Sequence, residues 1–297
     1  MFGMNEKVGR AYFNDMDGDQ LKVTSRFYTL QGEGPFRGMP AYFIRLAKCN
    51  LSCSFCDTYF DHGEDMSSKQ IFDQIEIDLR EFYELRATVR PDWTRPAPFA
   101  NHADKAKIVI VITGGEPTLQ TNLIPFLNEA NKYYFHTQIE SNGILFLDLP
   151  KETTYVVSPK CAEKDGSSVR YFSPNSDVLK RADCLKFVMS APENEQFSPY
   201  STVPQWALDW QHDYGREIFV SPMNIYNNEP KKAKEMRQSN KQITIEDRST
   251  TDEIISFWEP DLLDMDANQR NHEYAAEYCM KYGLTLNLQT HLFASLP

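Results

Sequence analysis

Short apolar segments rich in β-branched residues recur along the chain and alternate with amphipathic stretches. Apolar runs of this length predict buried strands, whereas apolar residues three or four positions apart predict helices. The expected strands are Ala41 to Leu46, Lys107 to Thr113, Phe135 to Glu140, Thr154 to Ser158, Cys184 to Met189, Glu217 to Ser221 and Leu284 to Gln289. Strands that alternate with helices predict a mainly parallel α/β sheet, either doubly wound or curved into a barrel.

Three helices are predicted from apolar spacing and from their end signals. The first follows Ser67, which fits a capping box with Gln70 and precedes apolar residues at helical spacing, at Ile71, Ile75, Leu79 and Phe82. The second covers residues 119 to 132. The third covers residues 266 to 282 and ends before Gly283, a common helix stop. It places three tyrosines on one face, at Tyr274, Tyr278 and Tyr282.

Polar or glycine-rich turns end three successive strands. They are "TGGEP" (113–117), "ESNG" (140–143) and "SPK" (158–160). In parallel α/β folds the carboxyl ends of the strands lie at one edge, and the chemistry gathers there. We therefore expect these three turns to meet at one rim of the sheet.

The chain has 297 residues, which is long enough to bury a sizeable core. A single domain covering residues 1 to 297 is expected, since α/β barrel domains reach this length. Two polar stretches interrupt the pattern and predict insertions near residues 86–106 and 223–252. The first is rich in Pro and Arg, and the second is most simply a solvated loop or helix face.

The net charge of −11 limits the classes of partner that the protein is expected to bind. Nucleic acids and anionic lipids reward basic surfaces, so direct binding to either is not expected. The longest apolar runs, such as "IVIVI" from Ile108, are too short to span a bilayer, and no signal-like apolar region opens the chain. A soluble cytoplasmic protein with no membrane contact is the expectation.

Three cysteines are closely spaced in "KCNLSCSFCDTYF" (48–60), as C-x3-C-x2-C, at Cys49, Cys53 and Cys56. A structural zinc site needs four ligands, and a disulfide framework needs an even number of cysteines in an oxidising compartment. Three thiolates can instead hold three irons of a 4Fe–4S cluster and leave the fourth iron open to a small molecule. A zinc site completed by a distant histidine, or chance spacing, is the alternative.

The cysteine spacing resembles the signature of the radical S-adenosylmethionine (SAM) superfamily, including the aromatic Phe55 before the third cysteine. "GGEP" resembles its second signature, although alone it could be an ordinary turn. The resemblance implies a partial parallel (β/α)6 barrel with the cysteine loop at its C-terminal rim. It also implies that SAM chelates the open iron and is cleaved to methionine and a 5'-deoxyadenosyl radical.

The stretch "LQGEGPFRGMPAYFIRLAKCNLSCSFCDT" (30–58) is more specific, and it resembles the 7-carboxy-7-deazaguanine synthase family. Similar segments extend through "TGGEP", "ESNG", "VVSPK", "LKFVM" and "LQTHLFASLP", interrupted by the two insertions. This resemblance implies conversion of 6-carboxy-5,6,7,8-tetrahydropterin to 7-carboxy-7-deazaguanine with loss of ammonia. The product belongs to the route to queuosine and related deazapurines.

The resemblance also implies site residues. Cys49, Cys53 and Cys56 become the cluster ligands. The SAM contacts become Phe55, Cys56, Asp57, Gly114, Gly115, Glu116, Ser141, Ser158, Pro159, Lys160, Ser221, Pro222, Met223 and Asn224. One departure occurs in "VSPMN" (220–224), where the family usually has Gln-Pro-Met, so Ser221 weakens that contact.

Substrate and metal contacts follow in the same way. The implied pterin contacts are Leu30, Gln31, Gly32, Glu33, Arg45, Thr113, His291 and Pro297. Arg45 offers a fork for a carboxylate, and Gln31 can read the donor and acceptor edge of a pterin. Pro297 would act through a terminal carboxylate, and Thr58 would hold a Mg2+ ion that keeps waters. Without the resemblance, Arg45 fits a rim salt bridge, Thr58 a helix cap and His291 a core or surface residue.

The resemblance further implies a homodimer and an electron donor such as flavodoxin or ferredoxin. Two other classes remain open. Activases of glycyl-radical enzymes share C-x3-C-x2-C, although the upstream "LQGEG" argues for a small-molecule pocket instead. A non-enzymatic iron–sulfur or zinc scaffold is the third reading.

Overall fold

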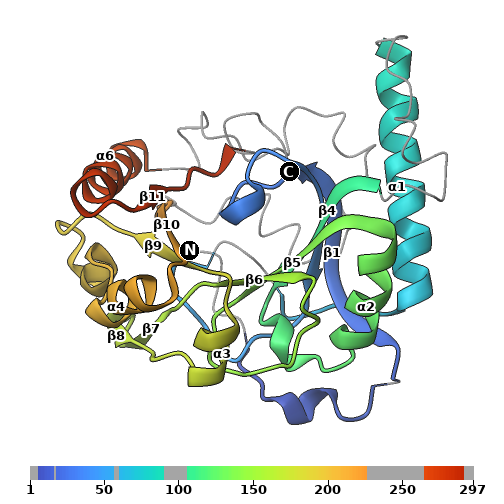
Figure 1. Cartoon of the computed structure of the whole chain (residues 1–297), viewed down its shortest axis with the longest axis horizontal. Helices are drawn as coiled ribbons and strands as arrows, with labels where there is room; N and C mark the ends of the chain where they lie inside the picture. Colours follow the sequence, from blue (N-terminus) through green and yellow to red (C-terminus); the bar gives the residue numbers. More distant parts are fainter. Residues whose placement is uncertain (1–5, 17, 57–59, 90–105, 226–263, 291–297) are drawn as a thin grey trace.

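A sheet of nine strands runs through the described part of the chain (Figure 1). The structure is a computed structural model that describes residues 6–16, 18–56, 60–89, 106–225 and 264–290. The strands of this sheet are β1 (Gln20–Leu30), β2 (Pro40–Leu46), β3 (Glu64–Ser67), β4 (Ala106–Gly114), β5 (Tyr134–Ser141), β6 (Thr153–Val157), β9 (Cys184–Met189), β10 (Glu217–Pro222) and β11 (Thr285–Leu286). A separate two-stranded sheet is formed by β7 (Cys161–Lys164) and β8 (Ser167–Tyr171). The α-helices are α1 (Ser68–Val89), α2 (Leu123–Tyr133), α3 (Ser176–Arg181), α4 (Gln205–Tyr214) and α6 (Met265–Tyr282).

The parallel strands lie side by side in the order in which they occur in the chain, from β2 through β4, β5, β6, β9 and β10 to β11. Since this order never reverses, right-handed crossovers return on the same face throughout. Figure 1 shows the helices around the outside of the curved sheet. The antiparallel strands β1 and β3 extend the edge beside β2. The predicted partial parallel barrel is confirmed, and the doubly wound alternative is wrong.

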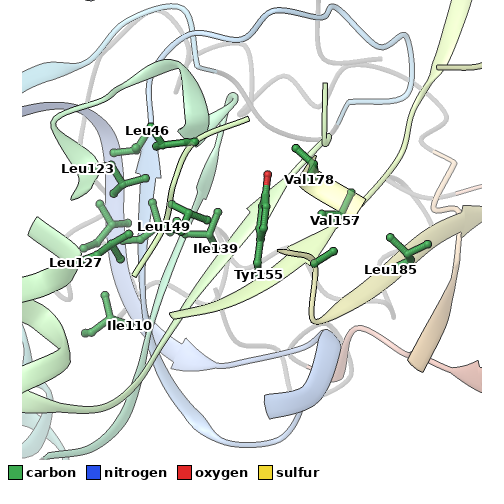
Figure 2. Close-up of a cluster of buried hydrophobic side chains, with 14 of the residues drawn as sticks. Leu46, Ile110, Leu123, Leu127, Ile139, Leu149, Tyr155, Val157, Val178 and Leu185 are labelled. Carbon is green, nitrogen blue, oxygen red and sulfur yellow. The ribbon is translucent and has the colours of Figure 1, made fainter. Parts of the chain in front are cut away.

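The two faces of the sheet bury different side chains. Ile108, Ile110 and Ile112 of β4 belong to the cluster under the helices. Figure 2 shows the labelled Ile110 of this cluster near Leu123 and Leu127 of α2. The alternate residues Val109 and Val111 pack with Ala41 on the inner face. Because strand side chains alternate, the inner face continues at Thr113, where β4 reaches the rim.

Helix α1 begins at the predicted capping box. The Ser67 N–H donates to Gln70 Oε1 at 2.8 Å, and the Gln70 N–H donates to Ser67 Oγ at 3.3 Å. Ile71, Ile75 and Leu79 are fully buried, whereas the end of the helix extends beyond the sheet (Figure 1).

Neither predicted insertion is described in full. Helix α1 continues to Val89, so the first residues of the insertion predicted near 86–106 are helical. Its following residues, and those of the second insertion after Ile225, lie outside the described residues. The division into one domain stays a prediction. No helix in the described ranges combines the length and apolar character needed to cross a bilayer.

The other two predicted helices differ in accuracy. Helix α6 ends at Tyr282, before Gly283, which has a left-handed φ of 67°. Its three tyrosines lie on one face as predicted, and their rings contact one another in sequence. Helix α2 begins at Leu123 rather than Leu119. A short 3-10 turn (Pro117–Leu119) comes first, and the Gln120 side chain instead joins the Lys22 N–H to the Ala47 carbonyl.

Several elements were not predicted. They are β1, β3, the β7–β8 hairpin, α3 and α4. The last predicted strand is shorter than expected, because β11 stops at Leu286. Asn287 then turns its side chain into buried hydrogen bonds with Gly34 and Ser221, 2.9 and 3.1 Å long.

Candidate active site

One cavity lies at the carboxyl ends of the parallel strands and receives side chains from both ends of the sheet. Of the residues predicted from sequence, it is lined by Gln31, Glu33, Arg45, Cys49, Cys53, Phe55, Cys56, Thr113, Gly114, Gly115, Glu116, Ser141, Ser158, Lys160, Ser221, Pro222, Met223 and Asn224. The three predicted rim turns therefore meet, as expected.

A few predicted residues are not in that lining. Leu30, Gly32 and Pro159 are described but do not line the cavity. Asp57, Thr58, His291 and Pro297 lie outside the described residues, so their roles stay predictions.

The cysteine loop follows β2 and is held by main-chain contacts. Lys48, which precedes Cys49, adopts a left-handed φ of 70°, and its N–H donates to the Phe60 carbonyl at 2.7 Å. The Val8 N–H donates to the Cys49 carbonyl at 2.8 Å. All three cysteines are free thiols, and they pack together around Leu51. The loop thus presents three thiols to the cavity from a fixed backbone.

Three cysteine thiols on one loop are a set of ligands that an iron–sulfur cluster can take. In the part of the chain that the structure describes, no three His, Cys, Asp or Glu side chains converge closely enough to hold one metal ion. A 4Fe–4S cluster instead binds each thiolate through a different iron. Burial raises the pKa of Cys49, helped by the charge of Glu116, and burial raises the pKa of Cys53 to about 11. Iron binding must therefore displace these protons.

The "GG" turn after β4 packs directly on the cysteine loop. Gly114 has φ of 109°, a conformation that side chains disfavour. A Cβ at Gly115 would lie 1.7 Å from the Lys48 carbonyl oxygen, so only glycine fits there. The Gly115 N–H donates to the Leu46 carbonyl at 2.8 Å, and the Glu116 N–H donates to the Lys48 carbonyl at 2.9 Å.

Glu116 is buried and hydrogen-bonded entirely within the protein. Its carboxylate accepts from the Thr118 N–H at 3.0 Å and from the Thr118 hydroxyl at 2.6 Å. It also accepts from the Ser141 hydroxyl and from the Asn142 N–H, both at 2.7 Å. Glu116 therefore joins the end of β4 to the end of β5, and these bonds hold the "GG" turn in place.

A second polar cluster lies on the inner face and is centred on Lys186 of β9. The Lys186 ammonium pairs with Glu33 and with Glu140, the latter at 3.1 Å. All three side chains are almost buried, with exposed fractions of 8%, 13% and 11%. Burial alone would lower the pKa of Lys186, but the two carboxylates outweigh it and hold that pKa above its ordinary value.

Amide side chains surround this cluster, and they connect distant parts of the chain. Gln31 and Gln138 each donate to Glu140 at 3.1 Å. Gln289, beyond β11, donates to Glu33 at 3.1 Å and accepts from Asn224 at 2.7 Å. The cluster carries two carboxylates and one ammonium, so its formal charge is −1.

Two further cations face the cavity. Arg45 places its guanidinium 4.8 Å from the Phe27 ring centroid, and that ring stacks on Phe43 at 5.2 Å. Lys160 donates to the Ser158 hydroxyl at 2.6 Å and to its carbonyl at 3.1 Å. Burial, and then the charge of Lys186, lower the pKa of Lys160.

The segment after β10 is fixed by buried asparagines. Met223 donates its N–H to the Met189 carbonyl at 2.7 Å, and its own carbonyl accepts from Asn271 at 2.7 Å. Ser221, which stands where the family usually has Gln, accepts from Asn287 at 3.1 Å. Ser221 is thus part of the framework as well as the cavity wall.

Several lining residues were missed by the sequence analysis. They are Phe27, Thr29, Phe43, Leu51, Phe60, Glu140, Asn142, Lys186, Val188 and Gln289. For two of these residues, the sequence contains a feature that could have indicated a role in the site. Glu140 opens the "ESNG" turn, and Lys186 is a lone charge in the apolar strand "CLKFVM". A charge within a buried strand predicts an internal partner, because an unpaired one would be too costly.

Comparisons with known proteins show which family the chain belongs to. The sequence profile of the Radical SAM superfamily matches residues 44–157, from β2 through β6. A protein of Rhodospirillum rubrum named 7-carboxy-7-deazaguanine synthase is 34% identical over 229 residues, covering 75% of this chain and 77% of that protein.

The chain belongs to the 7-carboxy-7-deazaguanine synthase family. A member from Rickettsia prowazekii is 29% identical over 298 residues, covering all of this chain and 96% of the relative. The crystal structure of QueE from Escherichia coli has a similar fold, with a TM-score of 0.52 and 21% identity, covering 95% of this chain and 98% of that one. Membership of the radical SAM superfamily implies a 4Fe–4S cluster and SAM as cofactors. The activase and scaffold alternatives are not favoured.

Proposed function

We propose that this protein is a 7-carboxy-7-deazaguanine synthase, a radical SAM lyase. It converts 6-carboxy-5,6,7,8-tetrahydropterin to 7-carboxy-7-deazaguanine with loss of ammonia. The observation that carries this proposal is the single rim cavity. It brings the three cysteine thiols of the family signature together with the buried Lys186 cluster. The family membership supplies the reaction.

The cofactor half of the cavity comprises the cysteine loop and the neighbouring rim turns. Cys49, Cys53 and Cys56 would ligate the cluster. SAM would lie against Gly115, Ser141 and the turn around Lys160, whose positions at the lining support the assignment. When bound, the reduced cluster and SAM supply a carbon-centred radical that removes a hydrogen atom from C6 of the substrate. The protein's own contribution is to hold the reactants in register and to exclude water.

The substrate half of the cavity comprises the Lys186 cluster and the Arg45 side. The pterin edge carries an amino group and ring N–H donors, which need acceptors in a site shielded from water. Glu33 and Glu140 provide carboxylate acceptors in fixed positions. Gln31 orients Glu140 by its hydrogen bond. Arg45, supported by the Phe27 ring, would receive the substrate carboxylate through its planar fork.

A Mg2+ ion beside Thr58 is part of the proposal and rests on the family resemblance alone. A hard cation that keeps most of its waters needs few protein ligands, so one hydroxyl and a substrate oxygen would suffice. Replacing Thr58 by Ala should weaken the magnesium dependence of turnover and leave the iron content intact. An unchanged magnesium response would remove Thr58 from the site.

A homodimer, a cytoplasmic location and a small redox protein as electron donor, such as flavodoxin or ferredoxin, also stay proposals. Size-exclusion chromatography with light scattering tests the dimer. Turnover with each purified donor in place of a chemical reductant tests the donor. A monomeric active enzyme would remove the dimer from the proposal.

The deciding experiment is anaerobic turnover of the reconstituted enzyme with the carboxytetrahydropterin. We expect 7-carboxy-7-deazaguanine to form and SAM to be regenerated. Substrate deuterated at C6 should transfer label to SAM or to 5'-deoxyadenosine. If a cluster-loaded sample forms no product and transfers no label, the proposed activity is wrong. Release of 5'-deoxyadenosine without need for a pterin would point instead to an activase.

A further inference from the structure

The β7–β8 hairpin lies directly after the "SPK" turn. Its tight turn contains Asp165 and Gly166, both with positive φ of 52° and 78°. This is the backbone of a two-residue hairpin turn that matches the twist of antiparallel strands. The hairpin is therefore a formed element rather than an irregular loop.

A bulge in this hairpin lies beside a carboxylate that contacts the cysteine loop. The pairing register shifts between Ala162 and Glu163, which leaves Val169 of β8 as the extra residue. Bulges locally increase the twist and often redirect a side chain beside a functional site. Glu163 lies opposite this bulge, and its carboxylate reaches the cysteine loop.

Glu163 binds the cysteine loop between two of its thiols. The Ser54 N–H donates to both Glu163 carboxylate oxygens, at 2.9 and 3.1 Å. The Ser54 hydroxyl donates to the same carboxylate at 3.1 Å. Ser54 is only 7% exposed, and it follows Cys53 directly. One carboxylate therefore accepts both available protons of the residue between Cys53 and Phe55.

Hydrogen bonds at both ends of the hairpin hold it in place, and they therefore restrict the position of the Glu163 carboxylate. The Cys161 N–H donates to the Tyr200 hydroxyl at 2.7 Å, and the Phe172 N–H donates to the Lys160 carbonyl at 2.9 Å. The Tyr200 ring contacts Phe55 of the cysteine loop edge-on at 5.1 Å. The loop and the hairpin are thus joined at two points.

The Glu163 carboxylate lies beside the position of the Cys53 ligand, because the Ser54 N–H that it accepts directly follows Cys53. Lys160 lines the same cavity as the Cys53 thiol. A carboxylate and an ammonium therefore both lie near this part of the cysteine loop. Removing only the carboxylate would leave the positive charge of Lys160 unopposed there.

We propose that Glu163 is a positioning residue for the iron–sulfur site, which holds the cysteine loop in its ligating conformation and lowers the midpoint potential of the bound cluster. Two physical effects act in the same direction. A nearby negative charge disfavours the reduced, more negative cluster, and hydrogen bonds to cluster sulfurs raise the potential. Glu163 supplies the charge and also withholds the Ser54 N–H and hydroxyl from the sulfurs. The inference rests on cluster ligation by Cys49, Cys53 and Cys56.

The test uses the reconstituted full-length protein and three variants. Glu163→Gln keeps an oxygen acceptor for Ser54 but removes the charge, and Glu163→Ala removes both. Asp165→Asn is the matched control, because it removes one exposed carboxylate from the same hairpin and Asn tolerates the positive φ. Midpoint potentials are measured by redox titration followed by electron paramagnetic resonance. Iron content and the rate of iron loss to a chelator are measured in parallel.

We expect Glu163→Gln to retain full iron and to shift the midpoint potential positively. At fixed ambient potential, the ratio of reduced to oxidised cluster should rise up to about tenfold, which is about 59 mV for one electron. Glu163→Ala should show at least this shift and also lose iron several times faster, while Asp165→Asn should match the parent. Potentials of both Glu163 variants equal to the parent's, or an equal shift in Asp165→Asn, would overturn the inference. If the parent protein takes up no cluster at all, the proposed function fails instead.

Discussion

Two groups of buried carboxylates lie within the same cavity, and their hydrogen bonds are satisfied in different ways. Glu116 accepts four hydrogen bonds, two from Thr118 in the adjacent 3-10 turn and two from the "ESNG" turn. Glu33 and Glu140 are instead held by one ammonium, that of Lys186, and by amide side chains. The first group is neutralised by local dipoles, whereas the second depends on a charge contributed by a distant strand.

The difference separates the roles of the two halves of the cavity. The hydrogen bonds of Glu116 link the segments that follow two adjacent strands, so this carboxylate holds the main chain of both turns in place. Its oxygens have little capacity left to accept hydrogen bonds from a ligand. The Lys186 cluster joins side chains from β9, β5 and the segment after β1, and it carries a formal charge of −1. Amino and N–H donors of a ligand can hydrogen-bond to these carboxylates. The rigid half suits a cofactor bound by backbone, and the charged half suits the pterin edge.

The largest effect should come from Lys186→Met, which removes the ammonium that pairs with both Glu33 and Glu140. Breaking a buried ion pair from one side costs about 3–5 kcal/mol of stability, because the remaining charge is left without a partner. We expect this loss in urea unfolding, together with a fall in kcat/KM of at least about 100-fold, or about 2.7 kcal/mol. The double variant Glu140→Gln with Lys186→Met should recover only part of the lost stability, because Glu33 keeps its buried charge, and it should not recover activity. Full activity of the single variant would show that the cluster does not bind substrate.

Glu116→Gln should have a smaller effect on stability and a different effect on ligands. Gln keeps the volume but places an NH2 group where the carboxylate accepts, so at least one buried donor loses its partner. Hydrogen bonds to a charged acceptor are worth about 1.5–3 kcal/mol each, which sets the expected loss. We expect weaker SAM binding by calorimetry, with pterin affinity nearly unchanged. Ser141→Ala removes one donor to Glu116 and also the acceptor of the Gly143 N–H and the Tyr155 hydroxyl, so it should cost about 1–3 kcal/mol. If Glu116→Gln weakens the pterin and spares SAM, the roles of the two halves are reversed.

A third variant, Gln289→Ala, removes one neutral member of the charged cluster. Its hydrogen bond to Glu33 and its bond from Asn224 would both be lost. Neutral hydrogen bonds contribute about 0.5–1.5 kcal/mol, so the KM for the pterin should rise about threefold to tenfold with kcat little changed. Gln205→Ala on the exposed face of α4 is the control and should match the parent. A fall in kcat with unchanged KM would contradict a role in orienting Glu33.

The features that could be predicted from sequence are those that depend on short local patterns. The strand Cys184 to Met189 was predicted with its correct bounds, because it is apolar, β-rich and ends at turn residues. The rim turns were predicted because each directly follows its strand. In contrast, β1 is long but irregular: its register shifts between Val23 and Ser25, which breaks the alternation on which a strand prediction depends.

In the candidate site, likewise, residues in local motifs could be predicted, whereas residues that pair across long stretches of the chain could not. The cysteine loop and the "GG" turn are local motifs, so their residues could be named in advance. Lys186 could not be paired from sequence, because its partners Glu33 and Glu140 lie far away along the chain. Only the order of the strands in the sheet places them together. The "DG" turn of the β7–β8 hairpin was a readable signal that the sequence analysis did not use.

The smallest expected effect is that the loss of stability caused by Lys186→Met does not change with pH. This result would distinguish an ammonium kept charged by its two carboxylates from one that burial alone would neutralise. The pKa of Lys186 in the folded protein is raised above the ordinary value of 10.5, because Glu140 and Glu33 outweigh burial. A group whose folded pKa is raised contributes stability that is fully present below its unfolded pKa and is lost only as the pH rises through the folded pKa. The destabilisation caused by Lys186→Met should therefore be constant, within about 0.5 kcal/mol, between about pH 6.5 and about pH 9.

The neighbouring Lys160 is the group that could disturb this measurement, since burial and the charge of Lys186 lower its pKa. The comparison is therefore repeated in a Lys160→Met background, where that titration is absent. Urea unfolding at each pH gives the stability difference that Lys186→Met causes. If this difference shrinks by half or more toward pH 9 in the Lys160→Met background, Lys186 loses its proton in that range. The two carboxylates would then not hold it charged, and the distinction between the two halves of the cavity would have to rest on geometry alone.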